Sequence, residues 1–141
     1  MKLLNKIFLY GLTFASLNSL SSCNKESTVE VKDQKDYLAP LIGTWRQIKQ
    51  NSITVEYIVK KTFNKDMSYS FSIEDPISHN LRAFRASIDD ITIDYYKAHI
   101  TSQYGNWSWN FVGDVENWKY YLDNNSLYEN DGNLYNIYRK E

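Results

Sequence analysis

From residue 43 onward, apolar and polar side chains alternate with a period of two, which is typical of β-strands buried on one face. The segment "MSYSFSI" shows this most clearly, because Tyr69 and Phe71 share one face while Ser70 lies on the other. The same alternation predicts further strands with apolar faces formed by Ile91, Ile93 and Tyr95, by Trp107, Trp109 and Phe111, by Trp118, Tyr120 and Leu122, and by the closing segment "GNLYNIYRK". No helical period interrupts the pattern, so the domain is predicted to be all-β.

Short segments rich in Asn, Asp and Gly separate these runs and predict tight turns. Residues of these types tolerate positive φ and close hairpins, so the strands on either side of each segment are antiparallel neighbours. The turn segments lie at residues 64–66, 74–76, 89–90, 104–106, 112–114, 123–126 and 130–133. About eight strands joined in this way predict an antiparallel up-and-down meander closed into a small barrel, which leaves no free sheet edge. A two-sheet sandwich is the alternative.

The first 22 residues have the composition of a secretory signal peptide. Lys2 and Lys6 precede the apolar run "IFLYGLTFASLNSL". This run becomes polar before it reaches the roughly 20 apolar residues that a membrane-spanning helix needs. Residues 20–22, Leu-Ser-Ser, stand directly before Cys23 and resemble a bacterial lipobox, in which the cysteine is acylated and becomes the first mature residue. A thiolate is nucleophilic enough to accept the lipid, so we predict lipidation of Cys23.

Residues 23–40 are predicted to be a lipidated flexible tether, because they are charged and polar without a sustained period. A short helix within "VKDQKDYLAPLIG", ended by Pro40 and Gly43, is the alternative. The barrel domain is then expected over residues 41–141.

The charge balance excludes one class of partner. The chain has 16 Lys and Arg against 17 Asp and Glu, so no excess of positive charge attracts nucleic acid. Lys60 and Lys61 form the densest basic element and are predicted to be a solvated strand end.

The predicted contact with the membrane is the lipid on Cys23, which places the protein in the cell envelope. Asn24 rather than Asp follows the cysteine, which favours the outer membrane over the inner.

The first predicted strand carries a family resemblance. "LIGTWRQI" resembles the Gly-x-Trp motif that opens lipocalin-like barrels, with Gly43 and Trp45 at its two positions. "KTFNKDMSYSFSI" and "YYLDNNSLYENDGNLYNIYRK" resemble the second and closing hairpins of small bacterial lipocalin-like domains. The resemblance implies that Trp45 forms the barrel floor and that Arg139, on the last strand, lies across its ring as a cation.

Aromatic side chains form the candidate site. The chain has 12 Tyr and 4 Trp, and such residues line most small-molecule pockets. His79 and His99 each stand alone in the sequence, so we expect no enzyme activity, no metal site and no cofactor. A small apolar or amphipathic ligand is predicted to bind the faces of Tyr69, Phe71, Tyr95, Trp107, Trp109 and Tyr120. Alternatively these side chains fill the barrel, which then contacts an envelope protein or glycan through surface aromatics.

Overall fold

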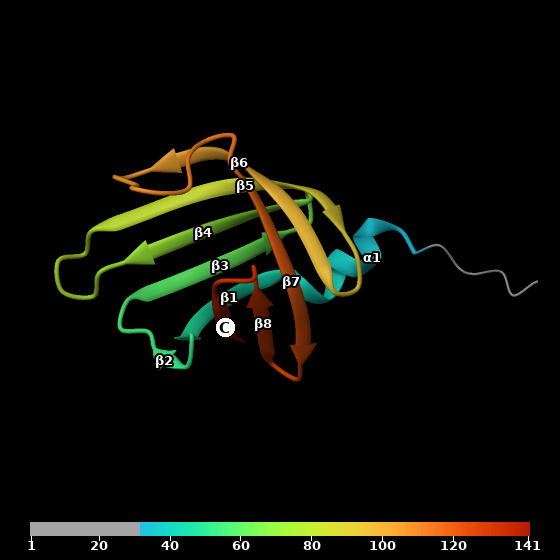
Figure 1. Cartoon of the computed structure of the whole chain (residues 1–141), viewed down its shortest axis with the longest axis horizontal. Helices are drawn as coiled ribbons and strands as arrows, with labels where there is room; N and C mark the ends of the chain where they lie inside the picture. Colours follow the sequence, from blue (N-terminus) through green and yellow to red (C-terminus); the bar gives the residue numbers. More distant parts are fainter. Residues whose placement is uncertain (1–31) are drawn as a thin grey trace, which may run out of the picture. The chain divides into compact units, whose positions relative to one another are not determined.

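The computed structural model describes residues 32–141, and Val31–Glu141 form one compact unit. The predicted signal peptide and Cys23 lie outside the described residues. Within them, no helix has the length and apolarity needed to cross a membrane. The elements, drawn in Figure 1, are α1 (Gln34–Leu38), η1 (Ala39–Leu41), β1 (Gly43–Gln50), β2 (Ile53–Thr54), β3 (Ile58–Asn64), β4 (Ser68–Glu74), β5 (Leu81–Ile91), β6 (Tyr95–Tyr104), β7 (Val115–Asp123), β8 (Ser126–Asn130) and β9 (Tyr135–Lys140).

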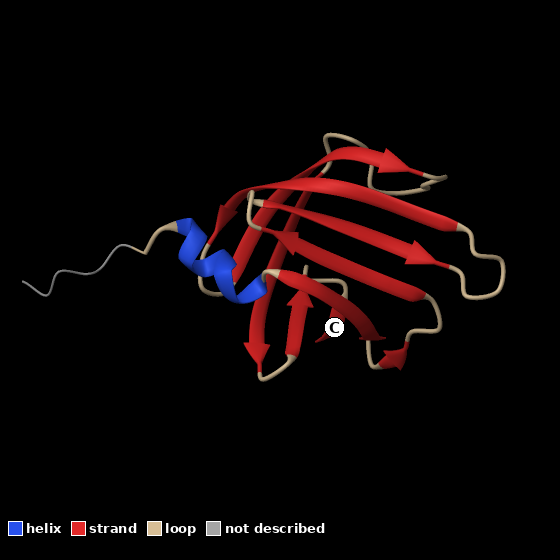
Figure 2. Cartoon of the chain, turned by 180° about the vertical axis from the view of Figure 1, so that it is seen from behind, coloured by secondary structure: helices blue, strands red, loops and turns tan. Residues whose placement is uncertain are grey.

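The strands form one antiparallel sheet that closes on itself. Apart from the two-residue β2, which pairs only with β1, the strands pair in chain order from β1 to β9. β1 also pairs with β9, where Trp45 lies opposite Lys140 and Gln50 lies opposite Asn136. Figure 2 shows the strands wrapping around a common interior. The predicted all-β up-and-down barrel is thereby confirmed, with eight strands in the closed circuit, and the sandwich is excluded.

The barrel has two different ends. Because the strands run up and down, the connections β3–β4, β5–β6 and β7–β8 lie at one end, next to α1 and η1 (Figure 2). We call this the closed end. The connections β1–β3, β4–β5, β6–β7 and β8–β9 lie at the opposite end, which we call the open end.

The N-terminal helical segment belongs to the folded unit. The side chain of Asp33 caps α1 by accepting from the Lys35 backbone N–H at 3.4 Å. Leu38 and Leu41 are 1% and 0% exposed and join the core. The folded unit therefore includes residues assigned above to the tether, whose predicted end at residue 40 lies too far along the chain. The short helix considered as the alternative is present, because its apolar side is buried by the barrel.

The Gly-x-Trp corner forms as the resemblance implies, with a different cation. The Trp45 side chain is 1% exposed, and its indole N–H donates to the Leu41 carbonyl at 2.7 Å. Lys140, not Arg139, lies over the Trp45 ring, with its Nζ 5.0 Å from the ring centre. Gly43 has φ +122°, and a Cβ there would lie 3.2 Å from the Lys140 Cε. The prediction for Arg139 is wrong by one register position, because Lys140 is the strand partner of Trp45 and Arg139 is exposed.

The β5–β6 turn corrects the strand expected over residues 91–95. The Thr92 N–H donates to the Tyr95 carbonyl at 2.7 Å, so the chain reverses there. Ile93 is 74% exposed in this turn. Alternation restarts after it with Tyr96, which is fully buried, while Tyr95 faces outward and donates its hydroxyl to a surface Asn.

A loop replaces the strand expected over "NWSWNF". Residues 105–114 connect β6 to β7, and Asn110 adopts a positive φ of 63°. The Phe111 N–H donates to the Asp114 carboxylate at 2.7 Å, which holds the bend. As a result Trp109 and Phe111 are 52% and 55% exposed instead of facing a barrel interior.

Candidate functional site

A cavity of about 390 Å³ lies inside the barrel near its open end. The part of the cavity nearest the open end is lined by residues of the connecting loops, namely Val55, Tyr57, Trp109 and Leu134. Its walls and floor are formed by strand residues, among them Val59, Lys61, Phe71, Ile73, Arg82, Phe84, Glu116, Trp118, Asn136 and Tyr138. Small-molecule sites have volumes of about 300–1,000 Å³, so the hollow is large enough for a ligand.

Aromatic rings form one wall of the cavity. Phe71 and Phe84 stack with ring centres 5.1 Å apart, since they are strand partners on β4 and β5. Trp107 packs edge-on against Phe84 at 5.4 Å, and Trp109 against Trp107 at 6.3 Å. The β6–β7 loop thus extends the aromatic wall from the strands to the cavity mouth.

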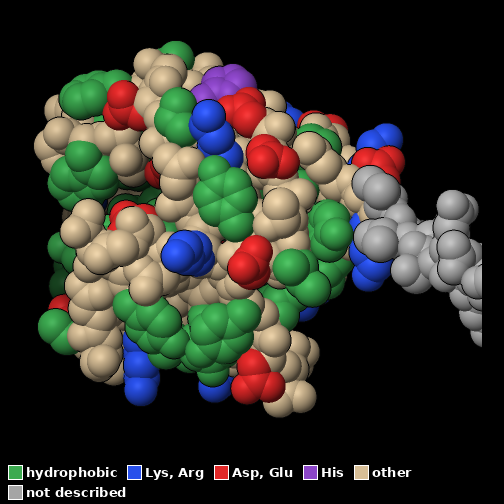
Figure 3. Space-filling view, turned by 45° about the vertical axis from the view of Figure 1, so that its right-hand side comes forward, with side chains coloured by type: hydrophobic (Ala, Val, Ile, Leu, Met, Phe, Trp, Pro, Cys, Tyr) green, Lys and Arg blue, Asp and Glu red, His purple; other side chains and the backbone are tan. Residues whose placement is uncertain are grey.

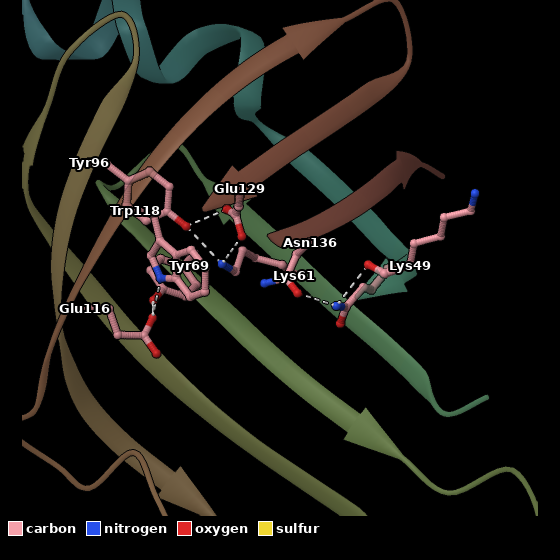
Figure 4. A network of polar contacts seen from close by, with 9 residues as sticks. Lys49, Lys61, Tyr69, Tyr96, Glu116, Trp118, Glu129 and Asn136 are labelled. Atoms are coloured by element: carbon pink, nitrogen blue, oxygen red, sulfur yellow. Dashed lines mark hydrogen bonds and ion pairs between the residues drawn. The ribbon is translucent and has the colours of Figure 1, made fainter. Parts of the chain in front are cut away.

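A buried ion pair lies at the floor of the cavity (Figure 4). The Lys61 Nζ lies 2.7 Å from Glu129 Oε2, and the two residues are 1% and 0% exposed. Lys61 also donates to the Tyr96 hydroxyl at 2.9 Å, and that hydroxyl donates to Glu129 Oε1 at 2.5 Å. Burial, followed by the negative charge of Glu129, raises the pKa of Tyr96 and Tyr138 well above the usual value. Both hydroxyls therefore stay protonated at neutral pH.

The expectation of a solvated Lys60–Lys61 strand end is wrong for Lys61. Lys60 does face solvent and pairs with Glu141 at 2.8 Å. Lys61 faces inward because it shares the period-two face of β3 with Val59 and Phe63, which are also buried. The sequence signal for this pair is a charged residue on each of two apolar strand faces. Lys61 lies on the buried face of β3, and Glu129 shares the buried face of β8 with Leu127.

Glu116, on β7, is the second interior carboxylate and lines the cavity. Its Oε2 accepts from the Tyr69 hydroxyl and, at 3.2 Å, from the Trp118 indole N–H (Figure 4). Burial, followed by the charge of Glu116, raises the pKa of Tyr69 well above its usual value. Sequence reasoning missed this group, because Glu116 belongs to no motif.

Two further polar features line the cavity. The Gln47 side-chain amide donates to the Asn136 amide oxygen at 2.7 Å, and both side chains are buried. At the mouth, the Arg82 guanidinium lies over the rings of Trp107 and Trp109, 5.7 and 5.8 Å from their centres. The cavity therefore combines aromatic walls with charged and amide groups at defined positions.

The structure divides the predicted ligand-binding residues into three groups. Phe71 and Trp109 line the cavity, and the Trp107 ring packs against both. Tyr69 does not line the cavity, but its hydroxyl donates to the carboxylate of Glu116, which does. Tyr95 and Tyr120 are not at the site.

Tyr95 and Tyr120 lie elsewhere for identifiable reasons. Tyr95 follows the β5–β6 turn and faces outward, so its hydroxyl donates to Asn117 at 3.0 Å at the surface. Tyr120 faces inward near the closed end, where its hydroxyl donates to the Thr92 carbonyl at 2.7 Å. Burial raises the pKa of Tyr120 to about 12. Tyr120 is therefore a core residue and not a ligand contact.

The two histidines, His79 and His99, lie at the surface. The Nδ1 of His79 is 3.2 Å from a Glu74 oxygen in an exposed hairpin, and that of His99 is 2.7 Å from an Asp89 oxygen on the outer wall. Within residues 32–141, no three His, Cys, Asp or Glu side chains gather as metal ligands would.

Comparison of the chain with known protein families, curated proteins and solved structures finds no match. The barrel is therefore known from the structure itself. The resemblance to lipocalin-like domains stays a prediction from the sequence, based on Gly43, Trp45 and the two hairpins quoted above.

Proposed function

We propose that this protein is an envelope-anchored lipoprotein whose barrel binds a small amphipathic ligand in the open-end cavity. The observation that carries the proposal is the 390 Å³ hollow, because a barrel filled by its own side chains would leave no such space. Aromatic walls with a few placed polar groups are typical of small-molecule sites. The carboxylate of Glu116, which lines the cavity, favours an amphipathic ligand over a purely apolar one.

Filling the cavity tests this function. Ile73, on β4, lines the hollow, so Ile73→Trp is expected to weaken binding of 1-octanol to residues 31–141 by at least about tenfold. Ile77→Trp is the matched control, because Ile77 is 90% exposed in the β4–β5 connection. Titration calorimetry measures both, and native mass spectrometry of the unmodified unit shows whether a ligand co-purifies. Equal affinity of the two variants would place binding outside the cavity.

An outward tyrosine cluster favours a second candidate, a module that contacts an envelope protein or glycan. Tyr121 and Tyr128 stack on the outer wall with ring centres 4.3 Å apart and an interplanar angle of 4°. Tyr135 lies beside them, its hydroxyl 3.2 Å from that of Tyr121. Exposed hydrophobic side chains also occur among charged ones on the face shown in Figure 3. Absence of any bound small molecule together with glycan binding would favour this candidate.

The lipid anchor has its own test. Cys23→Ser removes the thiol that takes the acyl group, so lipid labelling should disappear and the protein should leave the membrane fraction. Radiolabelled fatty acid and membrane fractionation measure the two effects. An unchanged membrane fraction would rule out the anchor.

A further inference from the structure

Glu116 presents a carboxylate oxygen that the described residues leave unused. Only Oε2 accepts hydrogen bonds, from the Tyr69 hydroxyl and the Trp118 indole. Within residues 32–141, no Lys, Arg or His pairs with Glu116, and no buried side-chain oxygen lacks a partner. Oε1, which has no partner, is therefore open to solvent. Figure 4 shows one oxygen of Glu116 directed away from the residues that bind the other.

The free oxygen lies where two hollows meet. Glu116 and Trp118 line both the cavity and an outer pocket of about 330 Å³. The two spaces also share Trp109 and Leu134. β8 begins to pair with β7 only at Lys119, so the β7 residues before it have no partner on that side. Glu116 is thus accessible to a molecule that enters from the open end.

The two cations that line the cavity, Lys61 and Arg82, form no ion pair with Glu116. Lys61 is held by Glu129 at 2.7 Å and by Tyr96. Arg82 lies at the mouth over the rings of Trp107 and Trp109 and forms no ion pair within 4.0 Å among residues 32–141. A ligand that displaces water from Glu116 must therefore supply a donor, because an unpaired carboxylate is costly to desolvate.

We propose that the ligand carries an ammonium group, which binds Glu116 Oε1 while the apolar part lies against the aromatic wall. This rests on the proposed ligand-binding function and names the chemical class of the ligand. A charged donor forms a stronger hydrogen bond to a carboxylate than a neutral hydroxyl does. Lys61 and Arg82 already lie over the rings of Trp118 and Trp109, so the Glu116 carboxylate is the group that selects the ammonium.

Three probes with one chain length test the assignment: octylamine, 1-octanol and octanoate, titrated into residues 31–141 at fixed ionic strength. Octylamine is expected to bind about tenfold more tightly than 1-octanol. Glu116→Gln keeps the side-chain shape and an oxygen for Tyr69, so it should weaken octylamine binding more than 1-octanol binding and thereby abolish the preference. Glu56→Gln is the matched control, because it removes the same charge from an exposed position near the open end and should keep the preference.

The outcomes separate the two proposals. If 1-octanol binds but octylamine binds no more tightly, or if Glu116→Gln keeps the preference, the ammonium site is wrong and ligand binding stands. The ammonium site would also be wrong if octanoate bound most tightly of the three probes and lost this affinity in Arg82→Gln. That result would place an anion-binding site at the cavity mouth. If none of the three probes binds, ligand binding in the cavity fails and the ammonium site fails with it.

Discussion

Replacing Lys61 by Met is expected to lower the free energy of unfolding by about 3–5 kcal/mol, because it leaves a buried carboxylate without its cation. Glu129 is 0% exposed, and its remaining partner is the neutral Tyr96 hydroxyl. Small domains are stable by only about 5–15 kcal/mol, so the loss is a large fraction of the total. Urea unfolding of residues 31–141, followed by tryptophan fluorescence, measures it.

Two companion variants show whether the ion pair is responsible. Lys60→Met breaks the neighbouring pair with Glu141, which is exposed to solvent, and should cost no more than about 1 kcal/mol. Lys61→Met combined with Glu129→Met removes both buried charges and should recover most of the loss. If the double variant is as unstable as Lys61→Met, the damage comes from packing and not from the unpaired charge.

The buried Lys61–Glu129 pair forms the floor of the cavity but does not ask the ligand for a polar group. A ligand that reaches the floor meets Lys61, Tyr96 and Glu129, whose polar atoms already bind one another. These groups need no partner from the ligand, whereas Glu116 Oε1 does. The floor therefore gives the site a polar boundary, and Glu116 gives it a carboxylate oxygen that a ligand has to satisfy.

The barrel was predictable because its signals are local. Alternation along "MSYSFSI" survives as the inward face of β4, and the turns expected at residues 64–66, 74–76, 123–126 and 130–133 do separate neighbouring strands. The turn expected at residues 89–90 is wrong, because both residues lie within β5. The two turns expected at residues 104–106 and 112–114 belong to one long loop between β6 and β7. The closing pair of β1 with β9 followed from the number of strands and the need to remove sheet edges. Hydrophobic period and turn chemistry thus determine most of this fold.

The details of the site were less predictable, because they depend on register and on turns. A turn at Thr92 exchanged Tyr95 for Tyr96 on the inner face, and bends at Asn110 turned an apparent strand into a loop. A one-residue difference in register placed Lys140 over Trp45 instead of Arg139. Short alternating segments cannot report these shifts, since a one-residue slip reverses every side chain.

The pairing of Lys61 with Glu129 was equally hidden. Each charge interrupts an otherwise apolar strand face, and the two residues lie on different strands far apart in sequence. A charged residue is usually solvated, so each one alone indicates the surface. Only the closed circuit of strands brings the two together in one interior.

Trp45→Ala is expected to lower the stability of the barrel, whereas Trp109→Ala is expected to weaken ligand binding. Trp45 is 1% exposed, holds the Leu41 carbonyl and supports Lys140, so its loss should cost about 3–5 kcal/mol of unfolding free energy.

Trp109 is 52% exposed in the β6–β7 loop, so its removal should cost less than about 1 kcal/mol. It lines the cavity mouth, however, and Trp109→Ala should weaken binding of octylamine and 1-octanol. Thermal unfolding and calorimetric titration of the two variants measure both quantities. A large loss of stability in Trp109→Ala would mean that the β6–β7 loop supports the barrel core. If ligand binding were also unchanged, the aromatic wall would not be part of the binding site. The comparison therefore separates the tryptophan that closes the barrel from the one that borders its opening.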